Sequence, residues 1–147
     1  MYHRGLPLLA LLLMLSQACA ERERIGIGPT EPQVSPAVTG TYAATRFLVE
    51  REGRVNDLIG EPDTRLDLRL NGDGSARGQL KIGTDPQLRT KSDLLGTWRL
   101  SVPNLVTFDF TSPTFLEEVG FQIVHDGLRG EWFGDDVRVV IELKKLD

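Results

Sequence analysis

Few residues of this 147-residue chain have the types and spacing that catalysis by a nucleophile or a general base needs. Its two histidines are His3, close to the start, and His125, which precedes Asp126-Gly127 and is interpreted as an exposed turn residue. No Gly-x-Ser-x-Gly sequence marks a nucleophilic serine on a strained turn. We therefore predict no catalytic residues and no enzymatic activity.

Carboxylates occur in two adjacent pairs, Glu117-Glu118 and Asp135-Asp136. Adjacent residues of a strand point to opposite faces, whereas glycoside hydrolysis needs two carboxylates that face each other, about 5 to 9 Å apart. Glu117 has the same phase as the apolar residues that follow it, Val119 and Phe121. It is therefore expected at the mouth of a barrel, either as part of a polar rim or as a group that orients a ligand.

A metal or cofactor site has little support in the sequence. A single cysteine cannot build a cysteine-based zinc site. The segment Asn71-Gly72-Asp73-Gly74 is superficially similar to a calcium loop, but it lacks the closing glutamate, and a hairpin turn explains it. No glycine-rich loop precedes a helix, as phosphate binding would require. We predict neither a metal nor a cofactor.

The first twenty residues have the features of a secretory signal. A short basic start with Arg4 is followed by an apolar stretch over 6–15 and then by the small and polar residues 16–20. About ten apolar residues are too few for a membrane-spanning helix, which needs about twenty. The chain is therefore expected to be exported, with residues 1–20 as the signal peptide.

Two processing routes fit the end of this signal. Ala18-Cys19-Ala20 suits ordinary signal peptidase, which would release a chain that starts at Glu21 and is secreted. The segment Ser16-Gln17-Ala18-Cys19 resembles the lipobox of bacterial lipoproteins, and the only cysteine of the chain falls at the position that is lipidated there. We favour Cys19 as the lipidation site, with two or more acyl chains anchoring a periplasm-facing protein of the bacterial cell envelope.

Composition describes a folded domain whose partner is not a nucleic acid. The 17 basic and 21 acidic residues give a formal net charge of -4, whereas phosphate binding needs clustered positive charge. With 40% hydrophobic and 26% charged residues, the chain has room for one folded domain. Residues 21–39 contain prolines and glycines and are predicted to form a flexible tether before a domain at 40–147.

Hydrophobicity over residues 40–147 follows a period of two, which is typical of strands with one buried and one exposed face. Turn residues divide this stretch, and no amphipathic helix is available to cover a sheet. Closure into an eight-stranded antiparallel up-and-down β-barrel would bury the apolar face and remove both edges, while a two-sheet sandwich is the competing architecture. The expected strands lie near 41–51, 64–70, 76–82, 95–102, 105–110, 116–124, 128–134 and 137–144.

Four short segments carry a family resemblance. They are Gly40-Thr41-Tyr42, the stretch 70–74 with Gly78, Gly96-Thr97-Trp98, and the stretch 126–130. In these residues the chain resembles the lipocalin-like β-barrels, especially the small bacterial forms found in exported proteins and lipoproteins. The resemblance implies a barrel whose interior holds one small apolar ligand.

The barrel interior is thus the predicted ligand site, and its lining is the set of large residues with the inward phase. An eight-stranded barrel is just wide enough to be filled by side chains or to hold one small ligand, so both outcomes stay open. The alternative function is a structural or interaction lipoprotein with a filled core, which contacts an envelope protein through its outer surface. For that surface, Phe133 and Val140 are candidates for an exposed apolar patch. The candidate ligand-binding residues are Leu66, Leu68, Trp98, Phe108, Phe121, Trp132 and Glu117.

Overall fold

The computed structural model of this chain describes residues 35, 37–83, 85, 88–101 and 103–147. The expected signal segment, Cys19 and most of the expected tether lie outside these residues. Val38, at the end of the tether segment, is buried, and its carbonyl oxygen accepts a hydrogen bond of 2.7 Å from the hydroxyl of Tyr42. Among the described residues, no helix is long and apolar enough to cross a membrane.

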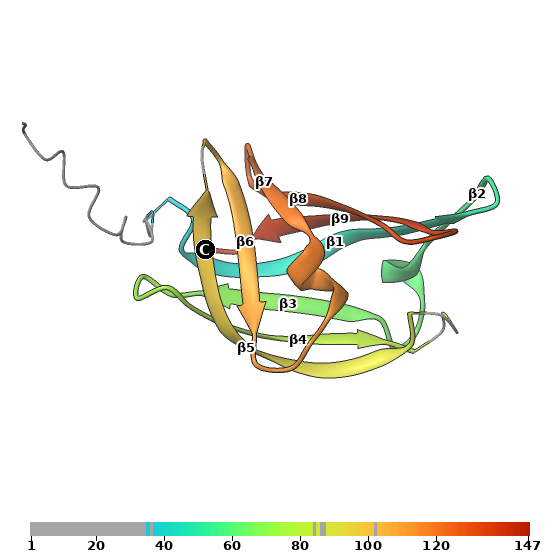
Figure 1. Cartoon of the computed structure of the whole chain (residues 1–147), viewed down its shortest axis with the longest axis horizontal. Helices are drawn as coiled ribbons and strands as arrows, with labels where there is room; N and C mark the ends of the chain where they lie inside the picture. The colour runs from blue at the N-terminus through green and yellow to red at the C-terminus, as the bar shows by residue number, and fades with distance from the viewer. Residues whose placement is uncertain (1–34, 36, 84, 86–87, 102) are drawn as a thin grey trace, which may run out of the picture. The chain divides into compact units, whose positions relative to one another are not determined.

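Eight antiparallel strands close into a barrel, which confirms the predicted fold class and its up-and-down order (Figure 1). Each strand pairs with the next one in the barrel, and β1 also pairs with β9, which closes the cylinder. This closed barrel is consistent with a lipocalin-like fold. The elements are β1 (Gly40–Arg51), β2 (Arg54–Asp57), η1 (Leu58–Gly60), β3 (Arg65–Leu70), β4 (Ser75–Ile82), β5 (Thr90–Ser101), β6 (Leu105–Phe110), η2 (Phe115–Glu118), β7 (Gly120–Val124), β8 (Gly127–Phe133) and β9 (Arg138–Lys145).

The short strand β2 lies outside this cylinder and was not predicted, because residues 52–63 were expected to form a loop. It pairs only with the last residues of β1, from Leu48 to Arg51. The two residues between the strands, Glu52 and Gly53, both have positive φ, as the tight hairpin turns that match strand twist require. All four residues of β2 are exposed, so its sequence carries no alternation of buried and exposed positions that could have revealed it.

Two strand boundaries also differ from the prediction. β5 begins at Thr90, whereas the sequence predicted a start near residue 95. The prediction missed these first residues because the inward positions are occupied by Thr90 and Ser92, and an apolar residue there would have indicated a strand. The strand predicted for 116–124 begins at Gly120, and the residues before it form the 3-10 helix η2. A capping box between Thr114 and Glu117 fixes the start of that helix.

β5 is the long, curved strand that carries the sheet around the barrel (Figure 1). Its first part pairs with β4 and its last part with β6, and Gly96 belongs to both registers, opposite Ala76 and opposite Phe110. A Cβ atom on Gly96 would lie 2.0 Å from the carbonyl oxygen of Asp109. The glycine therefore permits the close approach of β6 at this bend.

The core fills the inside of the barrel with residues from every one of its eight strands. Inward positions alternate with polar outward ones, so the period of two in the sequence is the pattern of the core. At one end of the barrel, the indole Nε1 of Trp98 donates a hydrogen bond of 2.9 Å to the carbonyl oxygen of Asn71. The largest fully buried side chains are Trp98, Phe47, Phe121, Leu66, Leu68, Leu70, Leu80, Ile82, Leu94, Leu116, Leu128 and Ile141.

Asp73 shapes the β3–β4 hairpin, and its titration is a direct probe of that turn. The hydroxyl and the backbone N–H of Ser75 both donate to its carboxylate, at 2.6 and 2.8 Å, and these bonds lower the pKa of Asp73 below its usual value. A lowered pKa means that the contribution of the carboxylate to stability is present at neutral pH and is lost as pH falls through that value.

We expect Ser75→Ala to raise the pKa of Asp73 toward its usual value, because the hydroxyl donor is the largest cause of the shift. The shift should be partial, since the backbone N–H still donates. A pH titration of the carboxyl carbon by NMR measures this, with Ser75→Thr as the control that keeps the hydroxyl. An unchanged pKa in Ser75→Ala would contradict the assignment.

Candidate functional site

Five of the predicted ligand-binding residues lie together inside the barrel. Leu66 and Leu68 come from β3, Trp98 from β5, Phe108 from β6 and Phe121 from β7, and each is at most 6% exposed. Their phases agree with the prediction because all five lie in stretches of regular alternation. The structure therefore brings these residues into one interior.

Aromatic rings in this interior contact one another. The ring of Phe108 lies 5.3 Å from that of Phe110, stacked, and 5.5 Å from that of Phe121, edge to face, measured between centroids. These are favourable aromatic geometries, and rings in such contact occupy the space that a ligand would take. Inside the barrel, these three rings contact one another directly.

Trp132 and Glu117 lie differently from the other five. Trp132 is half-buried near the other end of the barrel, with its ring 5.5 Å from that of Phe115 and its Nε1 donating to the carboxylate of Glu118 at 2.7 Å. Glu117 lies on η2, not on a strand. Its carboxylate accepts hydrogen bonds from the backbone N–H groups of Phe110, at 2.8 Å, and Thr114, at 3.4 Å. These bonds engage both oxygens of Glu117 in the fold.

The role of Glu117 follows from the gap beside it. β6 and β7 pair at only two positions, so the end of β6 has no strand beside it on the β7 side, although β5 still pairs with it on the other side. The Glu117 carboxylate takes the place of a strand carbonyl for the N–H of Phe110, and the buried side chain of Leu116 holds η2 against the core. Glu117 thus closes the β6–β7 seam.

We expect Glu117→Ala to lower the free energy of unfolding by about 1 to 2 kcal/mol, because two backbone donors lose their acceptor. Urea denaturation measures the loss, and hydrogen exchange at the Phe110 amide should speed up locally. Glu117→Gln is the matched control, since it keeps an acceptor oxygen and should recover part of the loss. Equal stability of the alanine variant and the wild type would rule out this role.

One polar end of the barrel was not predicted as a site. The guanidinium of Arg51, at the end of β1, contacts the carboxylate of Asp85 at 2.5 and 2.9 Å. Asp85 is only 7% exposed, and it also accepts a hydrogen bond of 3.0 Å from the backbone N–H of Leu88. This ion pair ties the end of β1 to the segment that precedes β5.

A β-bulge in β1 explains why Arg51 points inward. The register between β1 and β9 shifts between Ala44 and Arg46, and this shift changes the phase of the residues that follow. After the bulge, Phe47 and Val49 are buried, and Arg51 continues their alternation. Arg51 therefore shares the inward phase of these two apolar residues.

A hollow of about 300 Å³ opens beside this ion pair, between the β1–β2 hairpin and the turn that follows β8. Its lining is mostly polar, and the Nε atom of Arg51 is buried without a hydrogen-bond partner. In the sequence, the signal for this hollow was Arg51, a charged residue that follows Phe47 and Val49 in the inward alternation of β1. The signal was hard to recognise because the bulge changes the phase of β1 before these residues. The lining residues are Val49, Arg51, Glu52, Arg54, Asn56 and Asp136.

Two further hollows and the exposed ring of Phe133 lie on the outer surface of the part of the chain that the structure describes. One hollow, of about 360 Å³, lies between the two hairpin turns and includes Phe133, which is 67% exposed. The other, of about 350 Å³, lies over β8 and β9 near Asp126. The expected joint patch of Phe133 and Val140 does not form, because Val140 is only 8% exposed and Arg138 lies over the ring of Phe133, 5.7 Å from its centroid.

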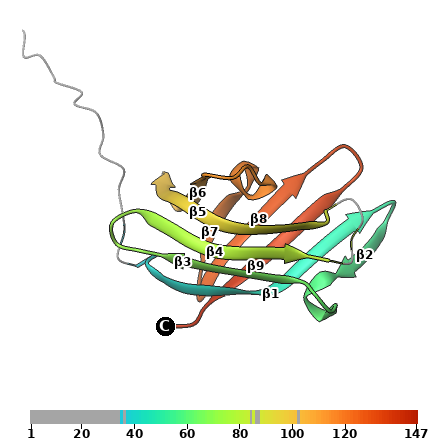
Figure 2. The ribbon, with the colours of Figure 1, turned by 90° about the horizontal axis from the view of Figure 1, so that it is seen from below.

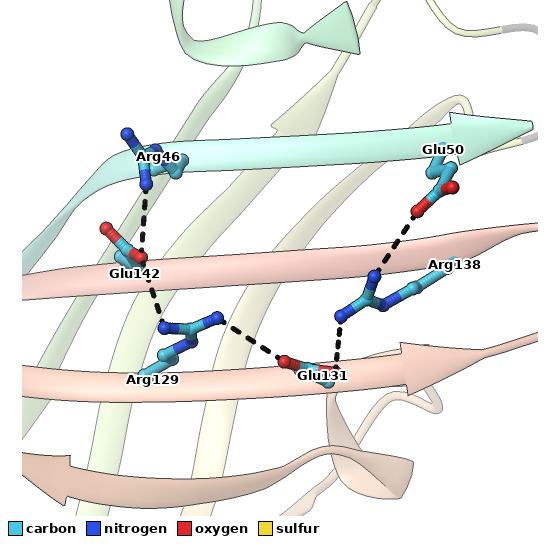
Figure 3. Close-up of polar contacts among 6 residues, drawn as sticks. All are labelled: Arg46, Glu50, Arg129, Glu131, Arg138 and Glu142. Carbon is cyan, nitrogen blue, oxygen red and sulfur yellow. Dashed lines mark hydrogen bonds and ion pairs between the residues drawn. The ribbon is translucent and has the colours of Figure 1, made fainter. Parts of the chain in front are cut away.

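Val140 lies on the outer face of β9, where its cross-strand partners are Leu48 of β1 and Glu131 of β8. The charged side chains on this face of β1, β8 and β9 are drawn in Figure 3. Six residues there form a continuous chain of ion pairs in which the sign of the charge alternates. The distances between paired atoms run from 3.1 to 4.0 Å. These six residues, called the paired face below, are Arg46, Glu142, Arg129, Glu131, Arg138 and Glu50.

Comparisons of the chain with protein-family models, with curated proteins and with solved structures find no match. In the part of the chain that the structure describes, no group of three or more His, Cys, Asp or Glu side chains is placed to hold a metal ion.

Proposed function

We propose that this chain is a binding module of the bacterial cell envelope. It is exported, anchored through a lipid on Cys19, and uses its barrel as a filled scaffold whose outer surface contacts an envelope protein. The observation that carries the proposal is the packing of Phe108 against Phe110 and Phe121, because an interior occupied by its own rings leaves the outer surface for binding. Phe133 supports it as a large apolar side chain exposed on that surface.

The anchor is tested on the full chain expressed in a bacterium. We expect mass spectrometry of the membrane fraction to find a mature chain that begins at Cys19 and carries acyl groups. When the membranes are washed with concentrated salt, which screens binding through exposed charges, Cys19→Ala should be found in the soluble fraction, because the variant has no thiol to lipidate. A wild-type protein that begins at Glu21 and carries no acyl group would contradict the anchor and leave the barrel as a secreted module.

The contact surface is tested separately, by a photo-reactive amino acid at position 133 in living cells. We expect one discrete adduct at this position and none at His125, an exposed turn residue that serves as the control. Adducts at neither position, or equal adducts at both, would contradict a specific partner at Phe133.

The hollow beside Arg51 favours a second function, that of a small-molecule carrier. Arg51 lines this hollow with a cationic side chain that an acidic ligand can contact, while Val49 supplies apolar contact. Native mass spectrometry of the chain purified without detergent tests this function. A reproducible added mass that disappears on denaturation would support a carrier. A bare mass after incubation with fatty acids would oppose it.

A further inference from the structure

The outer face of β3, β4 and β5 differs sharply from the paired face. Five basic side chains point outward from β3, β4 and the part of β5 that pairs with β4, with two carboxylates, Asp67 and Asp93, among them. This gives a formal charge of +3, or +2 when Asp63 beside Lys81 is included, in a chain whose net charge is -4. The five residues, called the basic face, are Arg65, Arg69, Arg77, Lys81 and Lys91.

Like charges lie directly opposite one another on the basic face. Arg69 is the cross-strand partner of Arg77, and Lys81 is opposite both Arg65 and Lys91. Directly opposed like charges destabilise a sheet, whereas on the paired face every contact joins opposite signs (Figure 3). The same barrel thus has one outer face with balanced charge and one where repulsion is retained.

Much of this positive charge is not neutralised within the protein. Arg65 pairs with Asp67, and Lys81 pairs with Asp63. Three members of the face, Arg69, Arg77 and Lys91, make no ion pair within 4.0 Å to any carboxylate that the structure describes. All three are exposed, so their charges are available to an external anion. Repulsion that the fold does not need is a common mark of a binding surface.

The shape and position of the basic face fit a broad, flat partner. Its strands lie side by side in front of β8 and β9 in the view of Figure 2, and the three hollows described above are lined by other strands. Leu95, opposite Arg77 on β5, is 52% exposed and adds an apolar side chain beside the cations. Cations around an exposed leucine suit the interface of an anionic bilayer.

The segment that precedes the barrel is long enough for the basic face to reach the membrane in which a lipid on Cys19 would be inserted. β1 begins at Gly40, opposite Leu70 at the end of β3, so the N-terminal segment joins the barrel next to Arg69. Twenty residues separate Cys19 from Gly40 and can span at most roughly 70 Å. A lipid on Cys19 would therefore keep the basic face within reach of headgroups.

We propose that the basic face docks on a membrane surface that contains anionic phospholipid. This inference is compatible with the anchor under the proposed function, but it does not require it. Every strand and every core residue of the described barrel lies after residue 37, so a chain that starts at Glu21 keeps the whole barrel. Because that chain lacks Cys19, it allows membrane binding by the basic face to be measured without the lipid anchor, and the two proposals can be tested separately.

The experiment measures co-sedimentation of the chain from Glu21 with vesicles. We expect binding to vesicles of phosphatidylcholine mixed with phosphatidylglycerol, and little binding to phosphatidylcholine alone. Binding should weaken as sodium chloride is added, because salt screens exposed charges. The double variant Arg69→Gln with Arg77→Gln should bind about 30-fold more weakly, since each cation near an anionic membrane contributes about fivefold in affinity.

The matched control is Arg46→Gln with Arg129→Gln, which removes the same number of cations from the paired face. We expect it to change binding by less than about threefold, because these arginines lie on other strands and are already paired. Asp93→Asn should strengthen binding about fivefold by removing a carboxylate from the basic face. Thermal unfolding of each variant shows that it is folded.

Three outcomes would overturn the proposal. They are equal binding to the two kinds of vesicle, equal losses in the two double variants, and no binding of the wild type to anionic vesicles at low salt. In the last case, the repulsion between the opposed cations of the basic face would instead be explained by binding of an acidic protein to that face. Acylation of Cys19 is unaffected by any of these results, so failure here leaves the anchor to its own test.

Discussion

Trp98→Ala is expected to lower the free energy of unfolding by about 4 kcal/mol, the largest loss among the substitutions considered. Trp98 is 1% exposed and is the bulkiest of the fully buried side chains. Its removal leaves a cavity between β5 and its neighbours, and the carbonyl oxygen of Asn71 loses the indole donor. The loss comes from packing and from one buried hydrogen bond.

Urea denaturation followed by far-ultraviolet circular dichroism measures this loss. Trp98→Phe separates the two causes, because it keeps a large ring and removes the hydrogen bond, and it should cost about half as much. Phe133→Ala, which truncates an exposed aromatic, is the control and should change stability by less than about 0.5 kcal/mol. A Trp98→Ala variant as stable as the wild type would show that this end of the barrel is loosely packed.

Gly96→Ala is expected to cost about 3 kcal/mol, although it adds only one methyl group. The added Cβ would lie 2.0 Å from the carbonyl oxygen of Asp109 and 2.7 Å from the Cα of Phe110. Both contacts are with backbone, which cannot rotate away as a flexible side chain can. β5 and β6 would have to separate where β5 passes from one partner strand to the other.

Gly60→Ala is the matched control, because nothing lies within 4 Å of a Cβ at that position. It should leave stability unchanged within about 0.5 kcal/mol or raise it slightly by restricting the unfolded chain. Urea denaturation of both variants gives the comparison. Similar values for Gly96→Ala and Gly60→Ala would mean that β6 does not approach β5 as closely as the structure shows.

The regular parts of the barrel were predictable because each strand has one buried and one exposed face. Leu66, Leu68 and Leu70 alternate with charged residues, and all three are buried. Short turns between such strands lead to pairing in sequence order, and the need to bury an uncovered face leads to closure. Five of the predicted interior residues lie inside for the same reason.

The misplaced elements share a different cause. β2 and the start of β5 have no apolar inward residues that would indicate a strand. The start of η2 is fixed by a side-chain cap, and its hydrophobicity pattern alone does not distinguish it from the start of a strand. Glu117 was expected on a strand facing inward, but its carboxylate is held by two backbone N–H groups at the β6–β7 seam. Hydrophobic periodicity cannot detect hydrogen bonds of this kind.

The sequence by itself determined that this chain is an antiparallel β-protein with a period-two core, and it favoured strands that follow one another around a closed sheet over a two-sheet sandwich. The pairing of β1 with β9 decided for the closed sheet. Only the tertiary structure decided how charge is distributed over the barrel's outer faces, because cross-strand neighbours depend on register. Register places Arg69 opposite Arg77 on one face and Arg138 between Glu50 and Glu131 on the other. The physical reason is that charge interactions act across strands, between residues that are distant in sequence.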